Sequence, residues 1–122
     1  MKTILLIEDN NAIRENLLEI LELSNYRVLT AADGEAGVAA AIQHRPDIVV
    51  CDIMMPVLDG YGVLNALRGR DELKHIPFIF LTAKSEPSER RLGIDMGAYD
   101  YLVKPIGGPE LLTSIEACFS NS

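Results

Sequence analysis

The chain alternates between two hydrophobic periodicities from its beginning to its end. Short runs of apolar and β-branched residues are typical of buried strands. Between these runs, apolar residues recur every three or four positions, as they do on one face of an amphipathic helix. The pattern predicts five strands, at residues 3–8, 26–31, 47–52, 76–82 and 99–103. It also predicts five helices that follow them in turn, at residues 10–25, 34–45, 60–70, 86–97 and 108–119.

Strict alternation of strands and helices indicates a parallel sheet, because helical crossovers connect parallel strands with a right-handed turn. The middle strands are apolar almost throughout, as expected of strands that are covered by helices on both faces. We therefore predict a doubly wound α/β sandwich. The length of 122 residues suits one compact domain, so residues 1–122 are expected to form a single domain.

Polar side chains gather where the predicted strands end. The first strand ends in Glu8 and Asp9, the third in Asp52, the fourth in Thr82, and the fifth is followed by Lys104. Binding sites of doubly wound sheets lie at the carboxyl ends of the strands. In the strand order 2-1-3-4-5, these five residues would meet at one edge of the sheet.

Each of these residues has a simpler explanation when it is taken alone. Asp9 could cap a helix, Asp52 could begin a loop, and Thr82 could be an ordinary β-former. Lys104 could be an ordinary surface lysine. Chance would scatter such residues over both edges of the sheet, so their shared edge favours a functional site.

The chemistry of the set points to phosphoryl transfer assisted by a metal. Three carboxylates repel one another, and a hard divalent cation such as Mg²⁺ relieves the repulsion through oxygen ligands. Asp52, between two apolar runs, is the candidate nucleophile. Thr82 and Lys104 would stabilise the phosphoryl oxygens by a hydrogen bond and by a positive charge.

Composition excludes several other classes of protein. The net charge of −7 argues against direct binding to nucleic acid, which usually needs a basic face. No apolar run approaches the roughly 20 residues of a membrane-spanning helix, and the apolar run near the first residue is too short for a secretory signal. We therefore expect a cytoplasmic protein that does not act in a membrane. The two cysteines and two histidines are widely spaced and give no support to a zinc site.

Four segments together resemble the receiver domain of bacterial two-component response regulators. They are the acidic pair at 8–9, DIMMPVLDGYG at 52–62, PFIFLTA at 77–83 and GAYDYLVKP at 97–105. The resemblance extends from about residue 2 to residue 119 and implies the flavodoxin-like (βα)5 fold, with a parallel sheet in the order 2-1-3-4-5. It implies a phosphorylation-controlled signalling switch, which catalyses only its own phosphoryl transfer and dephosphorylation. Asp52 would accept the phosphoryl group from a sensor histidine kinase or a phosphotransfer protein, in a Mg²⁺-dependent reaction.

The resemblance also implies a set of metal ligands. Asp9 would bind Mg²⁺ directly, and Glu8 would act through water or as a second ligand. Asp52 and the backbone carbonyl of Met54 would complete the protein ligands.

The resemblance assigns further roles near the phosphoryl group. Lys104 would contact the phosphoryl group, and its peptide bond to Pro105 would be cis. Thr82 and Tyr101 would form the switch: the threonine hydroxyl moves to the phosphoryl group, and the tyrosine ring then turns inward. The change would alter the face formed by residues 86–97, 99–103 and 108–119, which receivers use for an output domain, a partner protein or a phosphorylation-dependent dimer. The alternative for Tyr101 is an ordinary aromatic residue on an edge strand.

Some positions would affect the dephosphorylation rate, and others depart from the family pattern. Met54 and Lys84, each two residues beyond a site residue, would set the dephosphorylation rate. Tyr99 stands where many receivers have Asp, and helix 108–119 lacks the basic residues that pair receivers by charge. A charge-paired dimer is therefore not expected, while the cognate kinase, the stimulus, the output and the presence of further domains are left open.

Two alternative functions use the same fold. The first is a phosphohydrolase with an aspartyl nucleophile, which usually carries a general acid two residues further on. Met54 occupies that position and cannot transfer a proton. The second is an interaction module that is never phosphorylated, although such modules usually lose an acid, the acceptor or the lysine, and this chain retains them all.

Overall fold

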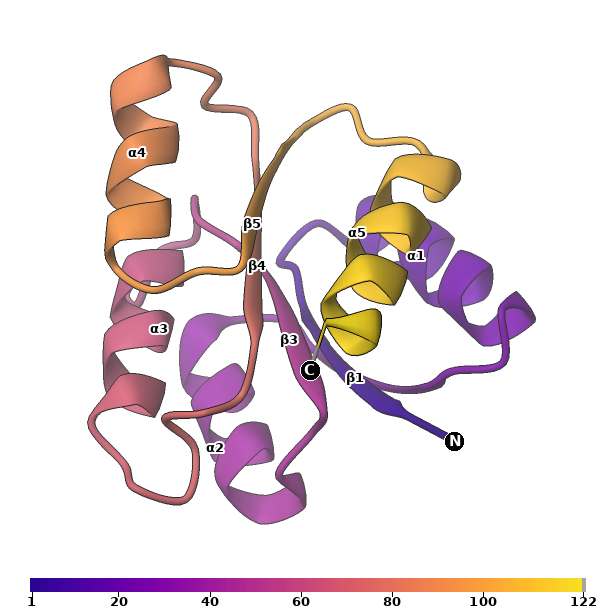
Figure 1. The fold of residues 1–122 in the computed structure, drawn as a ribbon, viewed down its shortest axis with the longest axis horizontal. Helices are drawn as coiled ribbons and strands as arrows, with labels where there is room; N and C mark the ends of the chain where they lie inside the picture. The colour runs from indigo at the N-terminus through magenta and orange to yellow at the C-terminus, as the bar shows by residue number, and fades with distance from the viewer. Residues whose placement is uncertain (122) are drawn as a thin grey trace.

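The computed structural model describes residues 1–121 and has the predicted doubly wound architecture (Figure 1). Five parallel strands form one sheet in the order β2-β1-β3-β4-β5, which confirms the predicted order. The strands are β1 (Thr3–Ile7), β2 (Arg27–Ala31), β3 (Ile48–Asp52), β4 (Phe78–Thr82) and β5 (Asp100–Val103). The helices are α1 (Asn11–Leu23), α2 (Gly34–His44), α3 (Gly60–Arg68), α4 (Pro87–Asp95) and α5 (Gly108–Ser120). Among the described residues, each helix falls short of the length and apolar content that crossing a membrane requires.

The helices cover the sheet in two layers. Helices α1 and α5 lie on one face, and α2, α3 and α4 lie on the other (Figure 1). Alternate residues of β1 enter opposite cores, because side chains of a strand point to alternate faces. Ile4 and Leu6 pack with residues of α1 and α5, whereas Leu5 and Ile7 pack with residues of α2 and α3. The central strands β3 and β4 are buried throughout, as their continuous apolar sequences predict.

The predicted helices and strands extend one or two residues too far at several ends. Helix α1 ends at Leu23, because Asn25 takes a left-handed conformation with φ of 69°. Helix α4 ends at Asp95, two residues before Gly97, where φ is 106°, a conformation that glycine adopts without steric cost. Strand β4 begins at Phe78, because Ile76 still belongs to a turn in which its N–H donates to the carbonyl of Leu73.

Short polar side chains fix where three helices begin. Asn10, Asp33 and Asp59 precede α1, α2 and α3, and each accepts a hydrogen bond from a backbone N–H three residues further on, at 2.8–2.9 Å. This is the usual geometry of a helix cap, which satisfies a backbone donor that the first turn leaves without a partner. The caps of α1 and α3 lie in the loops that follow β1 and β3, so they also fix the loops that carry the site.

Gly60 lets helix α3 start directly against the end of β3. A Cβ atom at this position would lie 2.6 Å from the carbonyl oxygen of Asp52 and 2.7 Å from the Cα atom of Ile53. The Gly60 N–H donates to the carbonyl of Ile53 at 2.9 Å, so the contact is also a hydrogen bond. Both opposing atoms belong to the backbone and cannot move aside as a flexible side chain would.

We predict that Gly60→Ala lowers the free energy of unfolding by about 2–3 kcal/mol, because the added methyl group forces a backbone shift. Gly69→Ala is the matched control, since the nearest atom to its Cβ position lies 3.5 Å away. Urea denaturation of both variants measures the difference. Equal stability of the two variants would contradict the close approach.

Candidate functional site

The strand register brings the ends of four strands together at one edge of the sheet. Ile7 pairs with Cys51, Asp52 with Leu81, and Thr82 with Val103. The residues that end these strands, or follow them directly, therefore lie at the same level, as expected for neighbouring parallel strands.

Three carboxylates form a cluster at this edge. One carboxylate oxygen from each of Glu8, Asp9 and Asp52 lies within 4.8 Å of the others. Glu8 is 0% exposed and Asp52 is 4% exposed, while Asp9 is open to solvent. Clustered oxygen donors with one solvent-facing member suit a hard divalent cation that retains part of its water shell. The donor set therefore fits the Mg²⁺ that the sequence predicts.

The ammonium of Lys104 partly neutralises the cluster. Its Nζ lies 2.7 Å from Oε1 of Glu8 and 3.2 Å from Oδ2 of Asp52. Burial alone would lower the pKa of Lys104, but the contacts with Glu8 and Asp52 raise it above its usual value, so the ammonium stays charged. Burial raises the pKa of Glu8 above its usual value, and Lys104 opposes part of that rise.

Both oxygens of the Asp52 carboxylate have partners. Oδ2 contacts Lys104, and Oδ1 accepts a hydrogen bond from the backbone N–H of Met54 at 3.1 Å. The carboxylate is therefore fixed at the floor of the site, between a cation and a backbone donor. The side chain of Met54 is 56% exposed at the rim, and the proposed metal contact through its backbone carbonyl stays a prediction.

Helix capping does not explain Asp9. The cap of α1 is Asn10, whose side chain accepts from the N–H of Ile13, and Asn10 donates its own N–H to Oε2 of Glu8 at 3.2 Å. Arg14 reaches back from the first turn of α1 and donates to the carbonyl of Glu8 at 2.8 Å. Sequence reasoning missed Arg14. A cation one turn into the helix that follows an acidic pair is the signal that could have indicated it.

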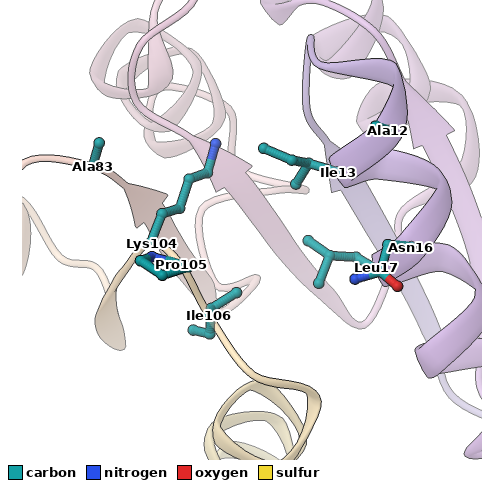
Figure 2. A pocket seen from close by; sticks show the side chains of 8 residues that line it. All are labelled: Ala12, Ile13, Asn16, Leu17, Ala83, Lys104, Pro105 and Ile106. Carbon is teal, nitrogen blue, oxygen red and sulfur yellow. The ribbon is translucent and has the colours of Figure 1, made fainter.

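A groove lies beside the site, between α1 and the segment that follows β5. Figure 2 shows Lys104, Pro105 and Ile106 on one side of it, with Ile13 and Leu17 of α1 opposite. The lysine side chain extends past the groove toward the site at the strand ends (Figure 2). The peptide bond between Lys104 and Pro105 is cis.

Thr82 and Tyr101 are joined through the backbone of Lys84. The Thr82 hydroxyl accepts a hydrogen bond from the N–H of Lys84 at 3.1 Å, and the Tyr101 hydroxyl donates to the carbonyl of Lys84 at 3.0 Å. Tyr101 is 1% exposed, and its ring packs against Phe80 with the centroids 6.2 Å apart. The ring already has the inward orientation that the sequence analysis assigned to the phosphorylated state.

The side chain of Lys84 turns to a partner outside the acidic cluster. Its Nζ lies 3.8 Å from Oε1 of Glu89, and Oε2 of Glu89 accepts a hydrogen bond from the Tyr61 hydroxyl at 2.8 Å. Sequence reasoning did not identify Tyr61 or Glu89 as neighbours of the site. They are 28 residues apart, and only the tertiary fold brings them together.

Comparison with known proteins decides the family. Residues 4–116 match the model of the response regulator receiver domain. The chain belongs to this family. It is therefore a receiver domain of two-component signal transduction, as its sequence motifs predict.

Individual relatives support this assignment. The probable transcriptional regulator ycf27 of Porphyridium aerugineum is 43% identical over 114 residues, which cover 93% of this chain and 46% of the relative. The structure of the chemotaxis protein CheY4 of Vibrio cholerae matches with a TM-score of 0.90 and 32% identity, over 96% of this chain and 98% of the other. The receiver domain of the sensor histidine kinase PA1611 of Pseudomonas aeruginosa matches with a TM-score of 0.87 and 34% identity, over 95% of each chain. Its structure has a magnesium ion coordinated in the active site cleft. The chain spans about half the length of the curated relatives it matches.

We predict that Lys104→Met lowers the free energy of unfolding by about 2 kcal/mol near neutral pH, because buried Glu8 and Asp52 lose their counter-charge. The deficit should shrink near pH 5. The folded-state pKa of Glu8 is already above its unfolded value, so falling pH protonates this carboxyl in the folded state first and relieves the repulsion. Urea denaturation at both pH values measures the effect.

Lys74→Met is the control for this experiment. Lys74 lies 3.5 Å from Asp71 on the surface, where both side chains are well exposed. An exposed pair of this kind contributes at most about 1 kcal/mol. A Lys104→Met variant that is no less stable than this control would show that Lys104 does not neutralise the cluster.

Proposed function

We propose that this receiver domain accepts a phosphoryl group on Asp52 from a phosphohistidine of a sensor histidine kinase or phosphotransfer protein. The observation that carries the proposal is the position of the Asp52 carboxylate, which has Lys104 at 3.2 Å and lies in a cluster with Glu8 and Asp9. A buried carboxylate beside one cation and two further acids is a poor structural ion pair. It is a suitable acceptor once a metal neutralises the excess charge.

Glu8, Asp9 and Asp52 would hold Mg²⁺, together with the backbone carbonyl of Met54. When bound, Mg²⁺ supplies positive charge that lowers the repulsion between the acidic cluster and an incoming phosphoryl group. The oxygen donor set supports this role, as does the magnesium ion of the related PA1611 receiver.

The residues of the chain divide the remaining chemistry between them. A carboxylate oxygen of Asp52 attacks phosphorus, the phosphorus–nitrogen bond of the phosphohistidine breaks, and its electron pair returns to the imidazole. Lys104 neutralises the negative charge of the phosphoryl oxygens, and the Thr82 hydroxyl donates a hydrogen bond to one of them. Water later attacks phosphorus, releases inorganic phosphate and restores Asp52, so the domain acts only on its own phosphoryl group.

Phosphorylation would then act on the face formed by α4, β5 and α5. A hydrogen bond from Thr82 to the phosphoryl group would move the loop that contains Lys84. The carbonyl of Lys84 accepts a hydrogen bond from Tyr101, so the movement would reach this ring. Because the ring of Tyr101 is already inward, the phosphoryl group would stabilise an orientation that the chain adopts by itself. We propose that residues 1–122 form one receiver domain, and that this face contacts an output domain, a partner protein or a second phosphorylated copy.

Incubation with acetyl phosphate and Mg²⁺ tests the acceptor role. We expect the protein to gain the mass of one phosphoryl group, and we expect Asp52→Asn to gain none, because an amide oxygen is a far weaker nucleophile. Intact-protein mass spectrometry measures the adduct. Asp59→Asn is the control, since Asp59 lies in the same loop and only caps α3, a role that Asn also fills.

This experiment, together with an assay on phosphomonoesters, separates the alternative functions. Absence of any adduct would favour an interaction module that is never phosphorylated. Steady turnover of several phosphomonoesters would favour a phosphohydrolase. An adduct of equal yield on Asp52→Asn would place the acceptor elsewhere.

Removal of one ligand tests the metal site. We expect Asp9→Asn to weaken Mg²⁺ binding by about tenfold or more, because the cluster loses one charged oxygen donor. The rise in thermal unfolding temperature with Mg²⁺ concentration measures the affinity. Asp33→Asn, which changes only the cap of α2, should behave as the unchanged protein. Identical affinity in Asp9→Asn would exclude Asp9 as a ligand.

A further inference from the structure

We propose that Glu89 is a positioning residue, which holds the side chain of Lys84 away from the phosphoryl pocket and thereby shortens the lifetime of the phosphorylated state. The inference rests on the proposed phosphorylation of Asp52. It concerns a carboxylate outside the acidic cluster, on helix α4.

The two oxygens of Glu89 contact two different segments of the fold. Oε2 accepts a hydrogen bond from the hydroxyl of Tyr61 on α3 at 2.8 Å. Oε1 lies 3.8 Å from Nζ of Lys84 in the loop before α4. The side chain of Glu89 is only 29% exposed, so solvent screens these contacts less than it would screen a fully exposed pair.

Tyr61 makes Glu89 a fixed anchor. The ring of Tyr61 packs edge-on against buried Phe80 of strand β4, with the ring centroids 5.3 Å apart. Burial raises the pKa of Tyr61, and the hydrogen bond to Glu89 raises it further, so the hydroxyl remains a donor at neutral pH. The carboxylate is therefore held by a rigid group that is attached to the core.

Lys84 joins this anchor to the site. Its backbone is fixed there, because its N–H donates to Thr82 and its carbonyl accepts from Tyr101. Its ammonium lies at the end of a flexible four-carbon stem. A cavity of about 280 Å³ beside the loop, lined by Lys84, Glu89 and three neighbours, leaves the stem room to move.

The phosphorylated site would compete with Glu89 for this ammonium. A phosphoryl group carries about −1.5 to −2 charges near neutral pH, and Lys84 is only two residues beyond Thr82. An ammonium on a phosphoryl oxygen would stabilise the phosphorylated protein and obstruct the approach of water. It would gain little in the loose transition state of hydrolysis, where the charge on these oxygens does not increase. Release of Lys84 from Glu89 would therefore slow dephosphorylation.

Glu89→Gln tests the proposal, because an amide oxygen keeps the hydrogen bond from Tyr61 while the charge that holds Lys84 is lost. After phosphorylation with acetyl phosphate and Mg²⁺, the donor is removed and the loss of the adduct is followed by mass spectrometry. We expect Glu89→Gln to dephosphorylate about threefold or more slowly than the unchanged protein. In the Lys84→Ala background, Glu89→Gln should have no further effect.

The coupling between the two changes separates positioning from a merely structural role. Glu86→Gln is the matched control, since Glu86 is exposed in the same loop and its side chain makes no capping hydrogen bond to α4. An unchanged rate in Glu89→Gln, or an equal effect with and without Lys84, would overturn this inference alone. Failure of the unchanged protein to form any adduct would overturn the proposed function as well.

Discussion

The main physical constraint on the site is the mutual repulsion of three carboxylates that the parallel sheet brings together. Glu8, Asp9 and Asp52 place oxygens within 4.8 Å of one another, and two of the three side chains are buried. Lys104 contacts two of them and offsets only part of the negative charge. Any further positive charge stabilises a site of this kind, and conversion of one carboxylate into an acyl phosphate would change its electrostatics. Attraction for a metal and sensitivity to phosphorylation thus have one physical origin.

The same edge of the sheet connects this charge to the surface by a short path. The backbone of Lys84 joins Thr82 to Tyr101. The carbonyl of Tyr101 accepts from Arg90 of α4 at 3.0 Å, and its N–H donates to the side chain of Asp100 at 2.8 Å. Thus two hydrogen bonds lead from Thr82 to Tyr101 on the edge strand β5. Two more join Tyr101 to Arg90 of α4 and to the neighbouring Asp100. These contacts offer a short path by which a movement at Thr82 would reach a surface helix.

Local patterns predicted most of the fold, because the hydrophobic periodicity of each segment indicates a strand or a helix and each parallel connection has one favoured hand. The shared edge of Asp52, Thr82 and Lys104 followed from topology alone. Element ends were less predictable: Asn25 is a residue type that readily ends a helix in the left-handed conformation, but the periodicity alone continued the helix to that position. The Tyr61–Glu89 contact was not predictable either, because it depends on how two helices far apart in the sequence are placed relative to each other, which periodicity does not encode.

What makes such a site a switch rather than a phosphatase is the chemistry at its rim. Hydrolysis requires water to reach phosphorus, and a dedicated phosphatase adds an acid that protonates the leaving group. Met54 fills that position here with a thioether that is 56% exposed, so no proton is delivered from it. A group at that position would protonate a departing alcohol and take a proton from the attacking water, and a thioether does neither. We therefore expect a phosphoryl group on Asp52 to persist for as long as the rim limits access by water. On the proposed function, the buried site would decide whether the carboxylate can react, whereas side chains of α4 and the neighbouring loops would decide how long the product lasts.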